Sequence, residues 1–152
     1  MHFITGGAFQ GKRNWVKQQY NIKDEQSAWW INGYNENIVC PSAFPPNVSL
    51  IVIEGCEELI YKLLQQHKEE VRKKWNEFLS ILRLWEQEQI GRKVVLIGCD
   101  IGGGIVPIEA EQRLWRDAVG WCYQDLAATA NRVDEIWYGI SSTLCNSREN
   151  TE

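Results

Sequence analysis

Two glycines and a lysine near the start of the sequence have the spacing of a phosphate-binding loop. Gly6, Gly11 and Lys12 fit the pattern G-x-x-x-x-G-K. Glycines let the backbone turn so that several N–H groups point at a phosphate, and the lysine adds a positive charge. Arg13 stands where the motif usually has a Ser or Thr that binds magnesium. The segment predicts nucleotide or phosphate binding, and a merely structural turn is the alternative.

The predicted contacts to the nucleotide form one continuous segment, and either ATP or GTP would suit it. The residues are Gly6, Gly7, Ala8, Phe9, Gln10, Gly11, Lys12 and Arg13. A dinucleotide fingerprint is less favoured, because Ala8 stands at the middle glycine of G-x-G-x-x-G.

Glu54 is the candidate carboxylate of the site. It closes the apolar run 49–54, where phosphate-loop enzymes place a carboxylate for Mg²⁺ or its water. A polar strand end that faces solvent is the other interpretation. With Arg13 in place of the hydroxyl, the metal would be held by Glu54 and the phosphates alone. Arg13 would then either contact a phosphate or point to solvent.

The hydrophobic pattern predicts strands and helices in alternation. Continuous apolar runs indicate strands, and apolar residues every three to four positions indicate helices. The expected strands are 2–5, 27–34, 49–54, 93–99 and 133–140, and the expected helices are 12–21, 57–89 and 109–130. The long segment 57–89 is expected to form either two helices or one long arm, and 35–47 is expected to be an irregular connection.

This alternation predicts an α/β fold with a mostly parallel sheet and helices on both faces. Ligands bind beyond the carboxyl ends of such strands, and the loops after Thr5, Glu54 and Cys99 all leave from that edge. We therefore expect a single-domain P-loop NTPase-like fold over residues 1–145, followed by a polar tail at 146–152.

The composition excludes several classes of function. A net charge of −4 over 152 residues argues against a broad nucleic-acid or anionic-membrane surface. No apolar run is long enough to span a bilayer. The five cysteines show no C-x-x-C spacing, which argues against a zinc site or a disulfide framework and fits the cytoplasm.

Several motifs resemble those of the adenosylcobinamide kinase / adenosylcobinamide-phosphate guanylyltransferase family. Residues 94–107, VVLIGCDIGGGIVP, are similar to the family's V-S-N-E-V-G-x-G-I-V-P. Residues 113–120, RLWRDAVG, are similar to its R-x-F-R-D-x-x-G. The segments QDLAATA at 124–130 and VDEIWYGI at 133–140 also resemble its C-terminal blocks. Thr5 to Ala8 and Gly11-Lys12 match its T-G-G-A-R-S-G-K-S.

The resemblance implies a phosphate-loop enzyme of cobalamin biosynthesis that commonly assembles as a trimer. Such enzymes use a nucleoside triphosphate to phosphorylate adenosylcobinamide and then transfer GMP to it through a guanylylated histidine. The resemblance also implies an acceptor-side loop, whose candidate residues are Asp100, Gly102, Gly104 and Pro107.

The sequence departs from the family at two places that bear on activity. Arg13 replaces the metal-binding Ser, and the interval 35–47 contains no histidine to carry the guanylyl group. His67 lies at another place in the order of elements, so the nucleophile is not carried over to it. Covalent guanylyl transfer is therefore not expected.

The sequence and the family resemblance lead to two hypotheses of function. The first is kinase-type phosphoryl transfer to a cobinamide-like acceptor, with Lys12 neutralising the phosphate and Glu54 positioning Mg²⁺ or the attacking hydroxyl. The alternative is a catalytically degenerate nucleotide-binding or interaction protein that keeps the fold.

Overall fold

A computed structural model describes residues 1–147 of the chain and contains one six-stranded sheet. The strand order is β2-β3-β4-β1-β5-β6, and every neighbouring pair is parallel except β5 with β6. The strands are β1 (His2–Thr5), β2 (Trp29–Asn32), β3 (Leu50–Glu54), β4 (Lys93–Ile97), β5 (Arg132–Trp137) and β6 (Ile140–Asn146). The predicted α/β fold with a mostly parallel sheet is confirmed, and it is the P-loop NTPase-like fold.

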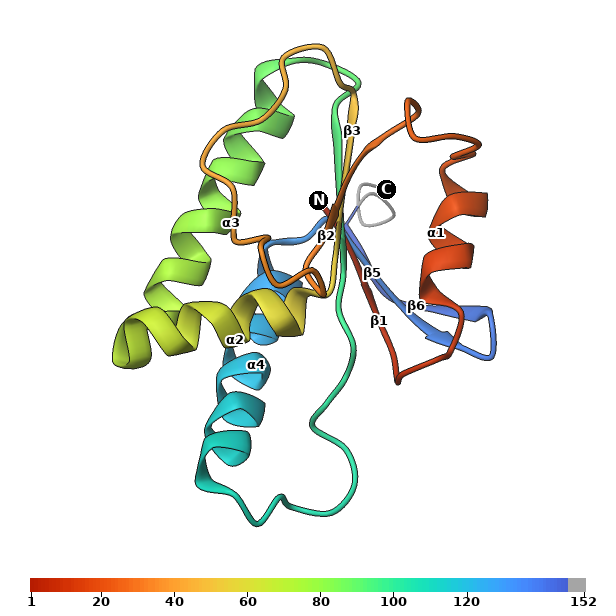
Figure 1. Cartoon of the computed structure of the whole chain (residues 1–152). Helices are drawn as coiled ribbons and strands as arrows, with labels where there is room; N and C mark the ends of the chain where they lie inside the picture. Colours follow the sequence, from red (N-terminus) through yellow and green to blue (C-terminus); the bar gives the residue numbers. More distant parts are fainter. Residues whose placement is uncertain (148–152) are drawn as a thin grey trace.

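Helices cover both faces of the sheet. The helix α1 lies on one side, and α2, α3 and α4 lie together on the other (Figure 1). The helices are α1 (Lys12–Gln19), α2 (Cys56–His67), α3 (Val71–Glu88) and α4 (Ala110–Thr129). Among the described residues, no helix is both long and apolar enough to cross a membrane.

The apolar run of β3 shows why the central strands are buried on both faces. All five residues of β3 are buried. Ile51 and Ile53 join the larger core beneath α2, α3 and α4, whereas Leu50 and Val52 join the smaller core beneath α1. Because side chains alternate along a strand, a continuous apolar run supplies both cores at once.

The predicted helical segment 57–89 is two helices. A short 3₁₀ helix, η1 (Lys68–Glu70), separates α2 from α3. Lys68 has φ 38°, outside the right-handed helical region, so the chain changes direction there. The two helices and α4 then pack against one another around the fully buried Trp75.

The prediction of a last strand at 133–140 was wrong at its C-terminal end. β5 ends at Trp137, and the chain turns back as the antiparallel β6. The turn residues Tyr138 and Gly139 have φ 50° and 75°, the positive values that a tight two-residue hairpin turn requires. The predicted domain boundary after residue 145 falls inside β6, and residues 148–152 of the predicted tail lie outside the described residues.

Candidate functional site

The glycine loop leaves the carboxyl end of β1 and leads directly into α1. Gly6 has φ 135°, and a Cβ at this position would lie 2.4 Å from the carbonyl oxygen of Ile136. Gly11 has φ 90° and caps α1 without any side-chain hydrogen bond. The first N–H groups of α1 therefore have no side-chain cap, and such groups at a helix start favour an anion.

Lys12 folds back over the loop. Its Nζ donates hydrogen bonds to the carbonyl oxygens of Gly6 at 3.1 Å and Gly7 at 2.6 Å. The ammonium group therefore lies inside the turn of the backbone. A phosphate in the loop would offer oxygens that can replace these carbonyls as acceptors.

The remaining residues of the loop divide into anchored and exposed ones. The carbonyl of Gln10 accepts the N–H of Gly139, and its side-chain Oε1 accepts the N–H of Tyr138. Ala8 and Phe9 are exposed, and Phe9 has φ 58°. The β5–β6 turn thus holds one side of the loop, a contact that the sequence motif did not predict.

Glu54 and Arg13 come together at the end of β3. Nη1 of Arg13 lies 3.6 Å from Oε2 of Glu54, whose side chain is 11% exposed. The indole Nε1 of Trp30 donates to the same Oε2 at 2.9 Å. The guanidinium of Arg13 also lies over the Trp30 ring, with Cζ 5.2 Å from its centroid. The sequence singled out Arg13 and Glu54 separately, whereas Trp30 was missed.

The loop after β4 lies beside the glycine loop. The N–H of Asp100 donates to the carbonyl of Gly6 at 2.9 Å, and Oδ1 of Asp100 accepts the N–H of Gly102 at 2.9 Å. Gly104 has φ 81° with open space around it. Two of the three predicted loops are therefore joined directly through the backbone at the carboxyl edge of the sheet.

Two arginines of α4 hold the predicted acceptor-side loop. Arg116 donates to the carbonyls of Gly102 and Ile105, and Arg113 donates to that of Pro107 at 3.0 Å. A cavity of about 250 Å³ lies between this loop and α4, and its lining includes Gly102, Val106, Pro107, Arg113, Arg116 and Asp117. The two sequence blocks that carry the family resemblance thus meet in one place.

A buried carboxylate near this edge was missed by the sequence reasoning. Glu57, in the first turn of α2, is 3% exposed. Its oxygens accept the N–H of Cys99 at 2.8 Å, the hydroxyl of Tyr34 at 2.5 Å and the hydroxyl of Tyr123 at 3.2 Å. The short interval between the end of β3 and Glu57 was the only sequence signal for its position.

The titratable neighbours of Glu57 are held in their neutral forms. Burial, together with the hydrogen bond to Glu57, raises the pKa of Tyr34, and burial raises that of Tyr123. Burial also raises the pKa of the Cys99 thiol, although the charge of Lys12 opposes the rise. Cys99 is therefore a thiol at neutral pH and a poor nucleophile.

Neither histidine belongs to this edge. His2 is buried at the opposite, amino end of β1, where its ring nitrogens contact Tyr20 and Asp134 at 2.6 Å. His67 is the last residue of α2. Over residues 1–147, no group of three His, Cys, Asp or Glu side chains is arranged to hold a metal.

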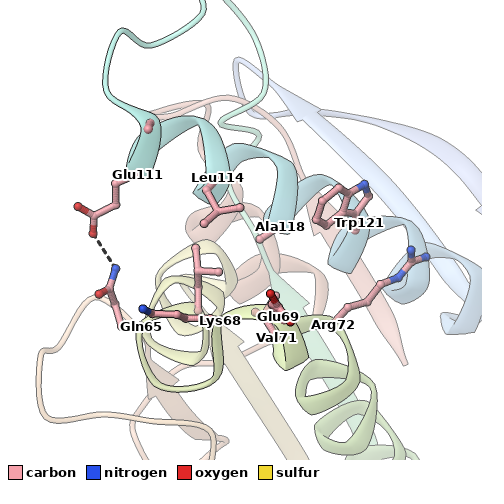
Figure 2. A pocket seen from close by; sticks show the side chains of 11 residues that line it. Gln65, Lys68, Glu69, Val71, Arg72, Glu111, Leu114, Ala118 and Trp121 are labelled. Atoms are coloured by element: carbon pink, nitrogen blue, oxygen red, sulfur yellow. Dashed lines mark hydrogen bonds between the residues drawn. The ribbon is translucent and has the colours of Figure 1, made fainter.

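A further hollow of about 990 Å³ lies between α2, η1, the first turn of α3 and α4 (Figure 2). Apolar side chains such as Leu114 and Trp121 line one wall, and Gln65 donates to Glu111 at its rim at 2.7 Å. Its lining contains none of the loop residues described above, so it is a separate feature of the surface.

Comparison with known proteins gives one family match. A model described as Cobinamide kinase / cobinamide phosphate guanyltransferase matches residues 42–144, about two thirds of the chain. The match includes Glu54, Glu57 and the acceptor-side loop but begins after the glycine loop. No curated protein matches the chain.

Proposed function

This chain belongs to the cobinamide kinase / cobinamide phosphate guanyltransferase family, and we propose that it binds a nucleoside triphosphate at Gly6 to Arg13 and phosphorylates a cobinamide-like hydroxyl. The observation that carries the proposal is the position of Lys12. Its ammonium lies inside a loop that joins β1 to a helix start without a side-chain cap, and this arrangement supports the proposal of a phosphate there.

In the proposed reaction the acceptor hydroxyl attacks the terminal phosphorus of the nucleotide. A new bond forms between phosphorus and the acceptor oxygen, the hydroxyl proton is released to water, the bond to the bridging oxygen breaks, and nucleoside diphosphate leaves. Lys12 offsets negative charge on the transferring group, and Glu54 is our candidate for positioning the hydroxyl. Either ATP or GTP would serve as the donor.

The acceptor is proposed to lie against residues 100–107. Asp100 and Gly102 are close to the glycine loop through the Gly6–Asp100 hydrogen bond, and Gly104 and Pro107 continue the same segment. This contact supports an acceptor and a donor site that share one edge of the sheet. Guanylyl transfer through a histidine is not part of the proposal, because the interval 35–47 contains no histidine, His2 is buried at the opposite edge and His67 is the last residue of α2.

The alternative is a nucleotide-binding or interaction protein of the same fold that has lost turnover. Arg13 favours this alternative, because it removes the hydroxyl that binds magnesium in the usual phosphate loop.

One experiment separates the two functions. ATP and GTP are titrated, each with and without Mg²⁺, into wild type and Lys12→Ala by calorimetry, and phosphate transfer to cobinamide is then measured. Binding that depends on Lys12 together with transfer supports the kinase. Such binding without transfer favours the degenerate protein, and equal, negligible binding by both chains contradicts both functions.

We propose that the protein acts in the cytoplasm as a homo-oligomer. The trimer that the family resemblance implies is our proposed assembly. All five cysteines are free thiols, including the exposed Cys145, which supports a reducing compartment. The strand β6 is an exposed edge with apolar side chains at Ile140 and Leu144, a surface suited to contact another subunit. Light scattering after size-exclusion chromatography measures the subunit number.

A further inference from the structure

We propose that the guanidinium of Arg13 takes the place of the magnesium ion, so that this chain binds its nucleotide without a divalent cation. The inference rests on the nucleotide binding proposed above and specifies how that site neutralises the phosphates. It applies to the one loop position at which the sequence departs from the phosphate-loop motif.

Arg13 is positioned by groups on two neighbouring strands. It follows Lys12 in the first turn of α1, where the usual motif has its metal-binding hydroxyl. Glu54 at the end of β3 lies 3.6 Å from its Nη1, and Trp30 of β2 lies beneath its guanidinium at 5.2 Å. The carboxylate that the sequence assigned to magnesium is therefore paired with a cation that belongs to the chain.

The residues present do not fit a magnesium ion at Glu54. Mg²⁺ requires about six oxygen ligands at roughly 2.0–2.1 Å in nearly octahedral geometry. The hydroxyl ligand is absent at position 13, and Oε2 of Glu54 already accepts the indole N–H of Trp30 at 2.9 Å. A metal on Glu54 would also have the Arg13 guanidinium as a neighbour of like charge.

A guanidinium can supply what the metal supplies to phosphate oxygens. It keeps its positive charge at any physiological pH and offers five N–H donors in a planar fork that matches phosphate oxygens. The side chain of Arg13 is 52% exposed, whereas that of Glu54 is 11% exposed, so the guanidinium retains open donors above the carboxylate. Lys12 and Arg13 together then place two positive charges at one loop.

The stacking contact with Trp30 explains why an arginine serves here better than a lysine. A cation over a tryptophan face is attracted to the negative face of the ring, and only the planar guanidinium can stack while it also forms paired hydrogen bonds. Lys17, one turn further along α1, also lies over this ring, with its Nζ 5.7 Å from the centroid. Lys17 is therefore the matched control for charge.

The test measures ATP and GTP affinity by calorimetry, in MgCl₂ and in EDTA, for wild type and for Arg13→Ser, Arg13→Lys and Lys17→Ser. We expect wild-type affinity to change by less than about twofold between the two buffers. Arg13→Ser restores the hydroxyl, so its affinity is expected to fall at least about tenfold in EDTA. Lys17→Ser removes the same charge and is expected to stay independent of magnesium.

The outcomes distinguish this inference from the proposed function. Wild-type binding that is lost in EDTA overturns the role of Arg13 and leaves nucleotide binding intact. If wild type binds no nucleotide in either buffer, the proposed function is contradicted, and so is the inference that rests on it. An Arg13→Lys chain that behaves as wild type would show that charge alone suffices and would remove the part of the argument that depends on Trp30. Circular dichroism of each variant confirms that it is folded.

Discussion

The backbone N–H of Asp100 donates to the carbonyl oxygen of Gly6 at 2.9 Å. This hydrogen bond joins the glycine loop after β1 to the acceptor-side loop after β4, two segments more than ninety residues apart in the sequence. Both groups belong to the backbone, so the residue types in the two motifs do not predict this hydrogen bond. The shape of the glycine loop and the place of the acceptor-side loop therefore depend on each other.

Gly6→Ala is expected to destabilise the fold and to abolish nucleotide binding. Alanine would require a φ of 135° and would bring its Cβ within 2.4 Å of the Ile136 carbonyl oxygen. Strain of this kind costs roughly 2 kcal/mol or more. Urea unfolding measures the loss. Gly103→Ala is the control, because a Cβ there meets nothing within 4 Å, and an equal loss in both variants would contradict the role of Gly6.

Glu57→Ala is expected to lower the free energy of unfolding by about 3 kcal/mol, since it leaves buried donors without an acceptor. The N–H of Cys99 and the hydroxyls of Tyr34 and Tyr123 all lose their carboxylate partner. Chemical denaturation measures the change. Glu58→Ala, at the next position of α2, is expected to stay within about 0.5 kcal/mol of wild type. Similar values for the two variants would show that the buried carboxylate contributes little.

The stability of the fold is expected to fall as the pH is lowered below about 6.5, the ordinary pKa of histidine. Burial lowers the pKa of His2 in the folded chain, although the hydrogen bond to Asp134 opposes this effect. The unfolded chain therefore binds a proton first, so the stabilisation is complete above pH 6.5 and declines below it, by at most about 1.4 kcal/mol per pH unit.

Urea unfolding at a series of pH values from neutral to mildly acidic measures this dependence. The slope between pH 6.5 and the lowered pKa should disappear in His2→Gln, whatever the absolute stability of that variant, and should persist in His67→Gln. A second decline is expected below pH 3.8, because hydrogen bonds from Arg132, Thr143 and His2 outweigh burial and lower the pKa of Asp134. An unchanged slope in His2→Gln would assign the first decline to another group.

Arg116→Ala is expected to loosen the acceptor-side loop without weakening nucleotide binding. Arg116 donates to the carbonyls of Gly102 and Ile105, so its loss frees the loop backbone. Amide hydrogen exchange over residues 101–108 should become at least about tenfold faster, while nucleotide affinity changes by less than about twofold. Arg83→Ala, an exposed arginine of α3, serves as the control. Unchanged exchange in Arg116→Ala would show that the arginine does not hold the loop.

The sequence alone determined the features that depend on local patterns. The spacing of Gly6, Gly11 and Lys12 predicted a loop between β1 and α1, and the apolar run before Glu54 predicted β3. Both are confirmed as elements, because glycine conformation and continuous burial depend on residues close together in the chain. The roles of the loop residues in nucleotide binding stay predictions.

Only the tertiary structure decided which distant residues meet. The hairpin strand β6 was missed because most of its residues are exposed, so its sequence lacks the apolar pattern of a buried strand. Its turn, Tyr138-Gly139, is also a weaker hairpin signal than Asn-Gly or Asp-Gly. The sequence placed Arg13 and Glu54 in separate motifs, and the position of Trp30 beside both depends on the pairing of β2 with β3. The hydrophobic pattern indicates whether a residue is buried, whereas strand order and register determine its neighbours. Strand order and register depend on contacts across the whole sheet.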